Sequence, residues 1–172
     1  MIVSAHDGYP RLLNSGADFL EVDIRRTPEG VIVLAHDEVR PHHRYTTFDE
    51  VLGRTGPEMG LHLDLKERGF ELELVGRALQ TRTPDKVVVT PDFVESAQTI
   101  KQHFPEVRVS PIDFLALDQQ YATDQALDQG VPIWVWTVDD KRLMQRFIRD
   151  KRIEAIITNR PDLALRLRSE RA

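Results

Sequence analysis

Short apolar runs recur along the chain and alternate with stretches in which apolar residues are spaced at helical intervals. Each run has the length of a β-strand and is rich in β-branched or aromatic residues, which favour strands. The pattern predicts nine strands, at residues 2–5, 19–24, 31–35, 61–65, 86–90, 107–110, 114–117, 133–138 and 155–158.

Several of the intervening segments carry one apolar stripe with helical spacing. Phe93, Ala97, Ile100 and Phe104 form such a stripe, and Pro105 then ends the helix. Comparable stripes predict helices over residues 70–79 and 143–148, and we expect a further helix over residues 118–129, ended by Gly130.

Alternating strands and helices are typical of a parallel α/β sheet. The strands at 19–24 and 31–35 are an exception, because the turn TPEG between them is too short for a parallel crossover and predicts a hairpin. The other eight strands predict a (β/α)8 barrel of the TIM type in a single domain over residues 1–172. This barrel is trimmed, because about 250 residues are typical. No helix fits between 107–110 and 114–117, so we expect that one of these two runs is not a true barrel strand.

Composition and charge narrow the class of protein. Apolar residues make up 41% of the chain and charged residues 30%, which is usual for a globular protein. The absence of cysteine excludes disulfides, cysteine-ligated metals and thiol catalysis. A net charge of -5 argues against a nucleic-acid partner. No apolar run reaches the roughly 20 residues of a membrane span, and MIVSAHDG does not start like a signal peptide, so we expect a cytoplasmic protein.

Two of the expected strands carry ionisable residues on one face. Glu21 and Asp23 are two residues apart and therefore point to the same side, as do His62, Asp64 and Lys66 in LHLDLK. The alternate residues of both strands are apolar and suit the face that packs under helices, so the charged face must point into the barrel. Carboxylates in an interior require compensation. Three of them offer hard oxygen ligands and predict one divalent cation, Mg²⁺ or Ca²⁺.

His6 and His36 lie at the ends of strands, on the rim where barrel active sites are built. Each ring can take up or release a proton near neutral pH. Other polar residues have simpler interpretations. Lys66 could form an ion pair with Asp64 or Glu67.

Three further histidines favour structural or solvated positions. His62 is expected to be a hydrogen-bonded histidine of the interior. His42 and His43 lie in a polar loop and are expected to be solvated.

Six blocks of the chain, in order, resemble motifs of the glycerophosphodiester phosphodiesterase family of phospholipase C-like barrels. AHDG (5–8) is similar to the family's H-R-G, and GADFLEVDIRRTPEGVIVLAHDE (16–38) to its G-A-D-x-I-E-x-D-V-x-x-T-x-D-G-x-x-V-x-x-H-D. TTFDEVL (46–52) resembles T-L-E-E-V-L, and LHLDLK (61–66) resembles N-I-E-I-K. VWTVDD (135–140) and IITNRPDL (156–163) resemble the closing W-T-V-N and I-I-T-D-x-P-D.

The resemblance implies a metal-dependent phosphodiesterase that cleaves glycerophosphodiesters into glycerol 3-phosphate and an alcohol. It implies these roles: Glu21, Asp23 and Asp64 as metal ligands, His6 and His36 as general acid and base, Lys66 at the phosphate, and Trp136 as a wall of the pocket. The implied substrate is a small phosphodiester or a lysophospholipid-like molecule, which connects the chain with lipid metabolism. In the implied mechanism a neighbouring substrate hydroxyl attacks phosphorus while one histidine removes its proton and the other protonates the departing alcohol. A cyclic phosphate forms, which water can open.

The chain departs from the family at two positions of the implied site. Asp7 replaces the arginine after the first histidine, and Asp64 replaces a glutamate. The related sphingomyelinase D toxins look similar at both positions. Arg25, Arg26 or Arg44 could supply a cation at the rim instead. An alternative function is that of a degenerate barrel which binds a phosphorylated ligand with little or no turnover. A nucleotide-binding protein is not indicated, because neither G-x-G-x-x-G nor G-x-x-x-x-G-K-[ST] occurs.

Overall fold

The structure is a computed structural model, and it describes residues 1–170. Contacts within the chain group it into two compact units, Met1–Glu21 with Ser110–Ala172, and Val22–Val109. The boundary falls inside one continuous strand, β2 (Phe19–Arg26).

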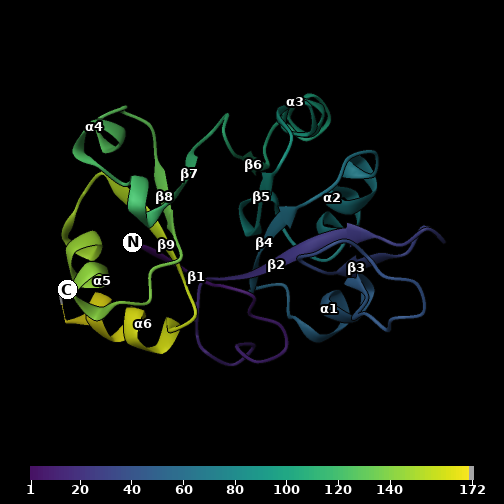
Figure 1. The fold of residues 1–172 in the computed structure, drawn as a ribbon, viewed down its shortest axis with the longest axis horizontal. Helices are drawn as coiled ribbons and strands as arrows, with labels where there is room; N and C mark the ends of the chain where they lie inside the picture. The colour runs from purple at the N-terminus through teal and green to yellow at the C-terminus, as the bar shows by residue number, and fades with distance from the viewer. Residues whose placement is uncertain (171–172) are drawn as a thin grey trace. The chain divides into compact units, whose positions relative to one another are not determined.

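Unit 1 contains parallel strands in the order β7-β8-β9-β1, and β1 continues the pairing to the first residues of β2. Helices α5 and α6 contact each other, and they pack on β9 and β1 respectively (Figure 1). The elements of this unit besides β2 are β1 (Ile2–Ala5), β7 (Leu115–Asp118), η2 (Gln119–Tyr121), α4 (Asp124–Leu127), β8 (Ile133–Trp136), α5 (Lys141–Arg149), β9 (Ile153–Thr158) and α6 (Pro161–Ser169).

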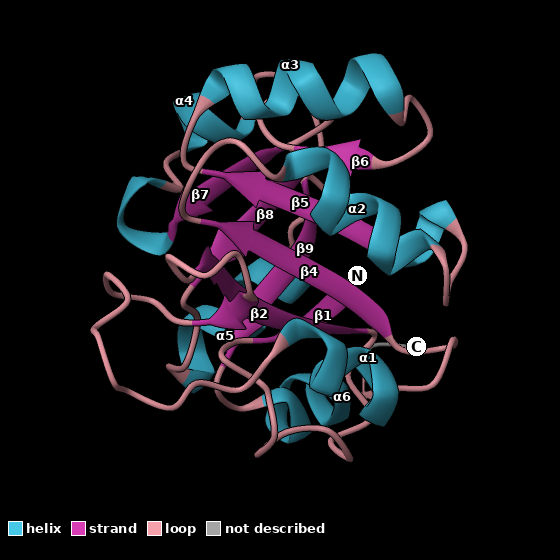
Figure 2. Cartoon of the chain, turned by 90° about the vertical axis from the view of Figure 1, so that its right-hand side faces the viewer, coloured by secondary structure: helices cyan, strands magenta, loops and turns pink. Residues whose placement is uncertain are grey.

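Unit 2 contains the strand order β6-β5-β4-β2, with β3 paired antiparallel to β2. Helices α2 and α3 lie against each other and against β5 (Figure 2). Its elements are β3 (Ile32–Leu34), α1 (Phe48–Arg54), β4 (Gly60–Leu65), α2 (Glu71–Leu79), η1 (Pro84–Lys86), β5 (Val87–Pro91), α3 (Val94–His103) and β6 (Arg108–Val109).

The fold class is α/β, of the trimmed (β/α)8 type that the sequence pattern predicts. The hairpin between β2 and β3 is confirmed: Thr27 N–H donates to the Val31 carbonyl at 2.9 Å, and Gly30 takes a φ of 90°, which favours glycine. The expectation that one of the runs at 107–110 and 114–117 is not a true strand was wrong, because β6 pairs with β5 and β7 pairs with β8.

One predicted helix was wrong in extent. Residues 118–129 form a short 3₁₀ turn and the one-turn helix α4, and no continuous helix. Thr123 separates the two and acts as the N-cap of α4, accepting a hydrogen bond from Ala126 N–H at 3.3 Å. Gly130 follows α4 with a φ of 72°.

The alternation on β2 and β4 is confirmed. Leu20, Val22 and Ile24 on β2, and the three leucines of β4, are at most 1% exposed. Their burial fixes the opposite face of each strand as the face that carries the ionisable residues. Within residues 1–170, no helix is long and apolar enough to cross a membrane.

Candidate active site

Three carboxylates on β2 and β4 come together as the sequence predicts. One oxygen from each of Glu21, Asp23 and Asp64 lies within 4.8 Å of the others. Glu21 and Asp23 reach this position because they alternate on one strand, with buried Val22 between them. Glu21 is only 3% exposed, and the side chains of Asp23 and Asp64 are 12% and 26% exposed.

Lys66 supplies positive charge to this cluster. Its Nζ lies 2.7 Å from Asp64 Oδ2 and 3.2 Å from Asp23 Oδ1. Burial works to lower the pKa of Lys66, but the Asp64 and Asp23 carboxylates outweigh it and raise that pKa. For Asp64, burial raises the pKa even though Lys66 opposes the shift. The predicted ion pair between Lys66 and Asp64 is therefore present. The second carboxylate that Lys66 contacts is Asp23, whereas Glu67 pairs with Arg25.

A turn after β1 holds Glu21 in place through hydrogen bonds. Asp7 N–H donates to Glu21 Oε2 at 2.7 Å, and Gly8 N–H donates to the Glu21 carbonyl at 3.0 Å. Asp7 adopts a φ of 42°, which aspartate tolerates better than most residues. A Cβ at Gly8 would lie 2.9 Å from the Ala5 carbonyl oxygen, so the close turn requires glycine. Asp7 therefore serves the cluster through its backbone, while its side chain is exposed.

The donor set fits a divalent cation. Three carboxylates from two adjacent strands are hard oxygen ligands, and they converge where an ammonium already offsets part of their charge. Such ligands suit Mg²⁺ or Ca²⁺ better than metals that prefer sulfur or nitrogen.

His6 is held by a hydrogen-bond network within unit 1. Its Nδ1 lies 3.2 Å from Asn159 Oδ1, and Asn159 Nδ2 donates to Asp139 Oδ2 at 2.8 Å. A carboxylate can only accept, so the amide nitrogen must face Asp139 and the amide oxygen must face His6. The His6 Nδ1 therefore carries a hydrogen, and Nε2 is the ring atom that accepts a proton in the neutral form.

Asp139 anchors this network in the backbone. Its Oδ1 accepts from Asn159 N–H at 2.8 Å and from Thr158 Oγ1 at 2.9 Å. Partial burial works to raise the pKa of Asp139, but these hydrogen bonds and the one from Asn159 Nδ2 hold that pKa below its ordinary value. An ionised Asp139 thus fixes Asn159, which fixes the ring of His6.

His36 has a much more open setting in unit 2. It lies in the segment after β3, and its side chain is 75% exposed. Its Nδ1 lies 3.1 Å from Asp37 Oδ1, and this hydrogen bond is the main reason why the pKa of Asp37 is lowered. The backbone is better fixed than the ring, since Arg25 Nε donates to the His36 carbonyl at 3.0 Å.

The remaining predicted residues divide into interior and exposed positions. His62 is 2% exposed and its Nε2 lies 3.1 Å from Thr90 Oγ1, as expected for a hydrogen-bonded interior histidine. His42 and His43 are exposed, as predicted. Trp136, at the end of β8, is 41% exposed.

Sequence reasoning assigned no role to Asp139 or Asn159. The signal that found His6 would have found them too, because Asn159 directly follows β9 and Asp139 lies three residues after β8. Which of these strand-end residues contact each other depends on strand order, which their sequence does not state.

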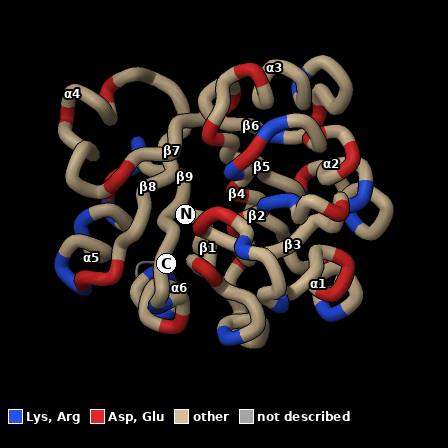
Figure 3. The backbone as a smooth tube through the Cα atoms, turned by 45° about the vertical axis from the view of Figure 1, so that its right-hand side comes forward, with Lys and Arg blue, Asp and Glu red and all other residues tan. Residues whose placement is uncertain are grey.

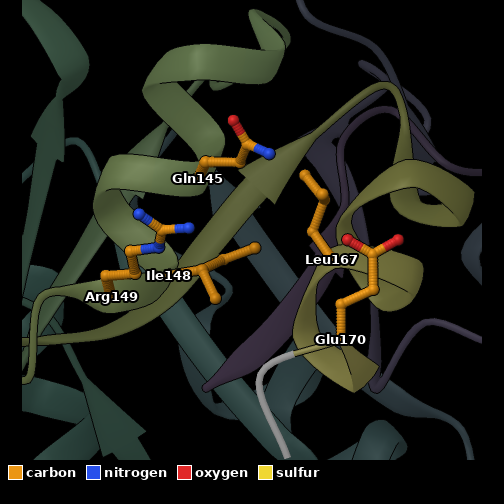
Figure 4. Close-up of a pocket in the computed structure, with 5 residues that line it drawn as sticks. All are labelled: Gln145, Ile148, Arg149, Leu167 and Glu170. Carbon is orange, nitrogen blue, oxygen red and sulfur yellow. The ribbon is translucent and has the colours of Figure 1, made fainter.

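Hollows in the described part of the chain include two with different surroundings. One of about 570 Å³ lies in unit 2 beside the arginines at the end of β2, which are blue in Figure 3. Another of about 260 Å³ lies between α5 and α6 (Figure 4) and is lined by Gln145, Ile148, Arg149, Leu167 and Glu170. The second contains none of the predicted site residues.

Comparison with known proteins shows similarity of fold. No protein-family model matches the chain, and no curated protein sequence matches it. Solved structures do match over nearly the whole chain. A glycerophosphodiester phosphodiesterase from Parabacteroides distasonis aligns with a TM-score of 0.80 at 20% identity, covering 99% of this chain and 97% of that chain.

Two other matches are similar in extent. A glycerophosphodiester phosphodiesterase from Thermotoga maritima gives a TM-score of 0.78 at 18% identity and covers 98% of each chain. An Oleispira antarctica phosphodiesterase, solved in complex with the product sn-glycerol-3-phosphate, gives 0.80 at 16% identity, covering 97% of this chain and 96% of that chain. At these identities the matches establish the fold, which is shared with several phosphodiesterases of this kind.

Proposed function

We propose that the chain is a divalent-metal-dependent phosphodiesterase that cleaves glycerophosphodiesters into glycerol 3-phosphate and an alcohol. The observation that carries the proposal is the convergence of Glu21, Asp23 and Asp64 beside Lys66. The shared fold supports it, since one structural neighbour was solved with glycerol 3-phosphate as its product. The proposed substrates are small phosphodiesters, including lysophospholipid-like ones.

Glu21, Asp23 and Asp64 would hold the cation, Mg²⁺ or Ca²⁺. When bound, such an ion supplies a Lewis acid that stabilises charge developing on a phosphoryl oxygen. Lys66 is raised in pKa and stays protonated, so its ammonium can contact a second phosphoryl oxygen. Trp136 is exposed enough to form a wall of the substrate site.

His6 is proposed as the general base. Its Nδ1–H is directed to Asn159, so the lone pair on Nε2 is available to take a proton from the attacking substrate hydroxyl.

His36 is proposed as the general acid that protonates the departing alcohol. Its hydrogen-bond partner is the Asp37 carboxylate, which can stabilise the positive charge of a protonated ring. Attack by the substrate hydroxyl forms a cyclic phosphate, and water can open this product with the two histidines in exchanged roles.

The test is release of glycerol 3-phosphate from glycerophosphocholine, measured with added Mg²⁺ or Ca²⁺ and again with a chelator. The proposal predicts metal-dependent release that is lost in His6→Ala. Release that is equal with chelator, or equal in His6→Ala, would exclude the proposed site as its source.

A second candidate function is a binding protein for a phosphorylated ligand with little or no turnover. Asp7 favours it, because a carboxylate stands where the resemblance expects an arginine at the phosphate, and its side chain is exposed. Binding of glycerol 3-phosphate without any diester cleavage would support this candidate over the enzyme.

A further inference from the structure

The hollow of about 570 Å³ in unit 2 adjoins the proposed site along the chain. Its lining comes from three segments: the end of β2 with the following turn, the segment after β3, and the loop between β4 and α2. Arg25 follows Asp23 by two residues, and Glu67 directly follows Lys66. A substrate whose phosphate contacts Lys66 can therefore extend its head group into this hollow, which has the volume of a small-molecule site.

Two of the three arginines that line the hollow are already neutralised. Arg25 Nη1 contacts Glu67 Oε1 at 2.9 Å, while Arg26 Nη2 contacts Glu73 Oε2 at 2.9 Å. Glu67 is fully engaged as well, because its Oε2 accepts from Arg26 N–H at 3.1 Å. These pairs shape the walls and leave little net charge to attract a ligand.

Arg68 differs from both. Its guanidinium lies over the ring of Phe93, 4.7 Å from the centroid, and among residues 1–170 no carboxylate lies within ion-pair distance of it. The Glu71 carboxyl is near enough for the charge of Arg68 to help lower its pKa, but Glu71 Oε1 and Oε2 accept hydrogen bonds from Ser96 and Gly69 N–H. Stacking orders the guanidinium plane while the N–H groups along its edge stay available, which is the arrangement that binds a carboxylate or phosphate. Phe93 is 37% exposed, so the pair stands at the surface.

We infer that the hollow is a head-group subsite, in which Arg68 binds an anionic substituent of the diester, a carboxylate or a second phosphate. The inference rests on the proposed function and names its substrate class. Glu38 also lines the hollow and is exposed, and it can pair with an ammonium group. A serine head group, with one carboxylate and one ammonium, matches both side chains.

Glycerophosphoserine and glycerophosphoethanolamine form a matched pair for the test, because they differ only in the carboxylate. We expect the ratio of their kcat/KM values to favour glycerophosphoserine by about fivefold or more, as for a charge-assisted hydrogen bond. In Arg68→Gln the ratio should fall towards one. Arg54→Gln makes the same charge change at an exposed residue, the last of α1, and is the control that should keep the wild-type ratio.

Equilibrium binding separates this inference from the proposed function. O-phosphoserine and phosphoethanolamine, titrated calorimetrically into the full chain, should differ in affinity by a similar factor, and Arg68→Gln should abolish the difference. Inositol 1,4-bisphosphate against inositol 1-phosphate tests the second source of negative charge in the same way. A preference in either pair that depends on Arg68 supports the subsite, even if no diester is cleaved.

The inference is overturned if neither anionic ligand is preferred by the wild-type chain, or if the preference is unchanged in Arg68→Gln. Cleavage of both diesters, with no binding preference in either ligand pair, would overturn the subsite and leave the proposed function standing. Absence of all cleavage, with the binding preference present, would support the subsite and contradict the proposed function.

Discussion

The two histidines of the proposed mechanism occupy very different surroundings. His6 follows β1 of unit 1 and is tied through Asn159 to an ionised Asp139. His36 lies after a three-residue hairpin strand in unit 2, is 75% exposed, and contacts the carboxylate of its own chain neighbour. One ring is fixed by tertiary structure and the other by a local contact.

The difference indicates different tasks. A base must present a lone pair in a fixed direction, and the His6 network specifies both the tautomer and the ring orientation. An acid that releases its proton to a leaving group benefits from a carboxylate that stabilises the charged ring. An exposed position also lets that ring exchange protons with solvent between turnovers.

The largest expected effect comes from removing either ring. His6→Ala and His36→Ala should each lower kcat by about 100-fold or more, as is usual for lost acid–base catalysis. Calorimetric metal binding should be unchanged in both, since neither residue is a proposed ligand. His103→Ala, an exposed histidine at the end of α3, is the control. Near wild-type activity of His36→Ala would remove His36 from the mechanism.

A smaller effect is expected from the partners of the two rings. Asn159→Leu removes the acceptor that orients His6 and should lower kcat by about tenfold, the equivalent of one hydrogen bond to a functional group. Asp37→Asn keeps an acceptor beside an exposed ring and should change kcat by less than about threefold.

The contrast between these two variants is the informative result. KM for glycerophosphocholine should stay close to its wild-type value in Asn159→Leu, because the lost contact orients a catalytic group. Equal losses of kcat in Asn159→Leu and Asp37→Asn would show that the His6 network has no special role.

The last predicted effect is on stability rather than on catalysis. Asp139→Ala removes a carboxylate that accepts three hydrogen bonds, and it should lower the unfolding free energy by about 1–3 kcal/mol near neutral pH. The folded pKa of Asp139 is lowered, so its contribution is present above the unfolded pKa, near 4, and is lost as pH falls through the folded pKa.

Denaturant unfolding at neutral and acidic pH checks this sign. The difference between wild type and Asp139→Ala should shrink on acidification. Asp37→Ala should match wild type at neutral pH because its side chain is 83% exposed. A difference for Asp139→Ala that grows in acid would contradict the lowered pKa.

The sequence predicts most of the fold because its signals are local. Period-two alternation on β2 and β4 identifies both the buried face and the carboxylate face before any pairing is known. The prediction of one helix over 118–129 was wrong because Thr123 caps a new helix within that segment. Capping competes with helix continuation, and the apolar pattern alone does not reveal which wins.

The candidate site was predictable where its residues lie on the same strand. Glu21 with Asp23, and Asp64 with Lys66, follow from spacing on one strand each. The link from His6 to Asn159 joins residues 153 positions apart and depends on the pairing of β1 with β9. The single domain over 1–172 stays a prediction, and the structure groups the chain into two compact units.

The measurement that tests the central claim most directly is calorimetric titration of Mg²⁺ and Ca²⁺ into the wild-type chain and into Asp23→Asn. Asp23 contributes one of the three carboxylates and also contacts Lys66, and the variant keeps the size of the side chain while removing its charge. The account predicts one divalent ion per wild-type chain and loss of that binding in Asp23→Asn. Equal stoichiometry and affinity in the two proteins would contradict a metal site at Glu21, Asp23 and Asp64.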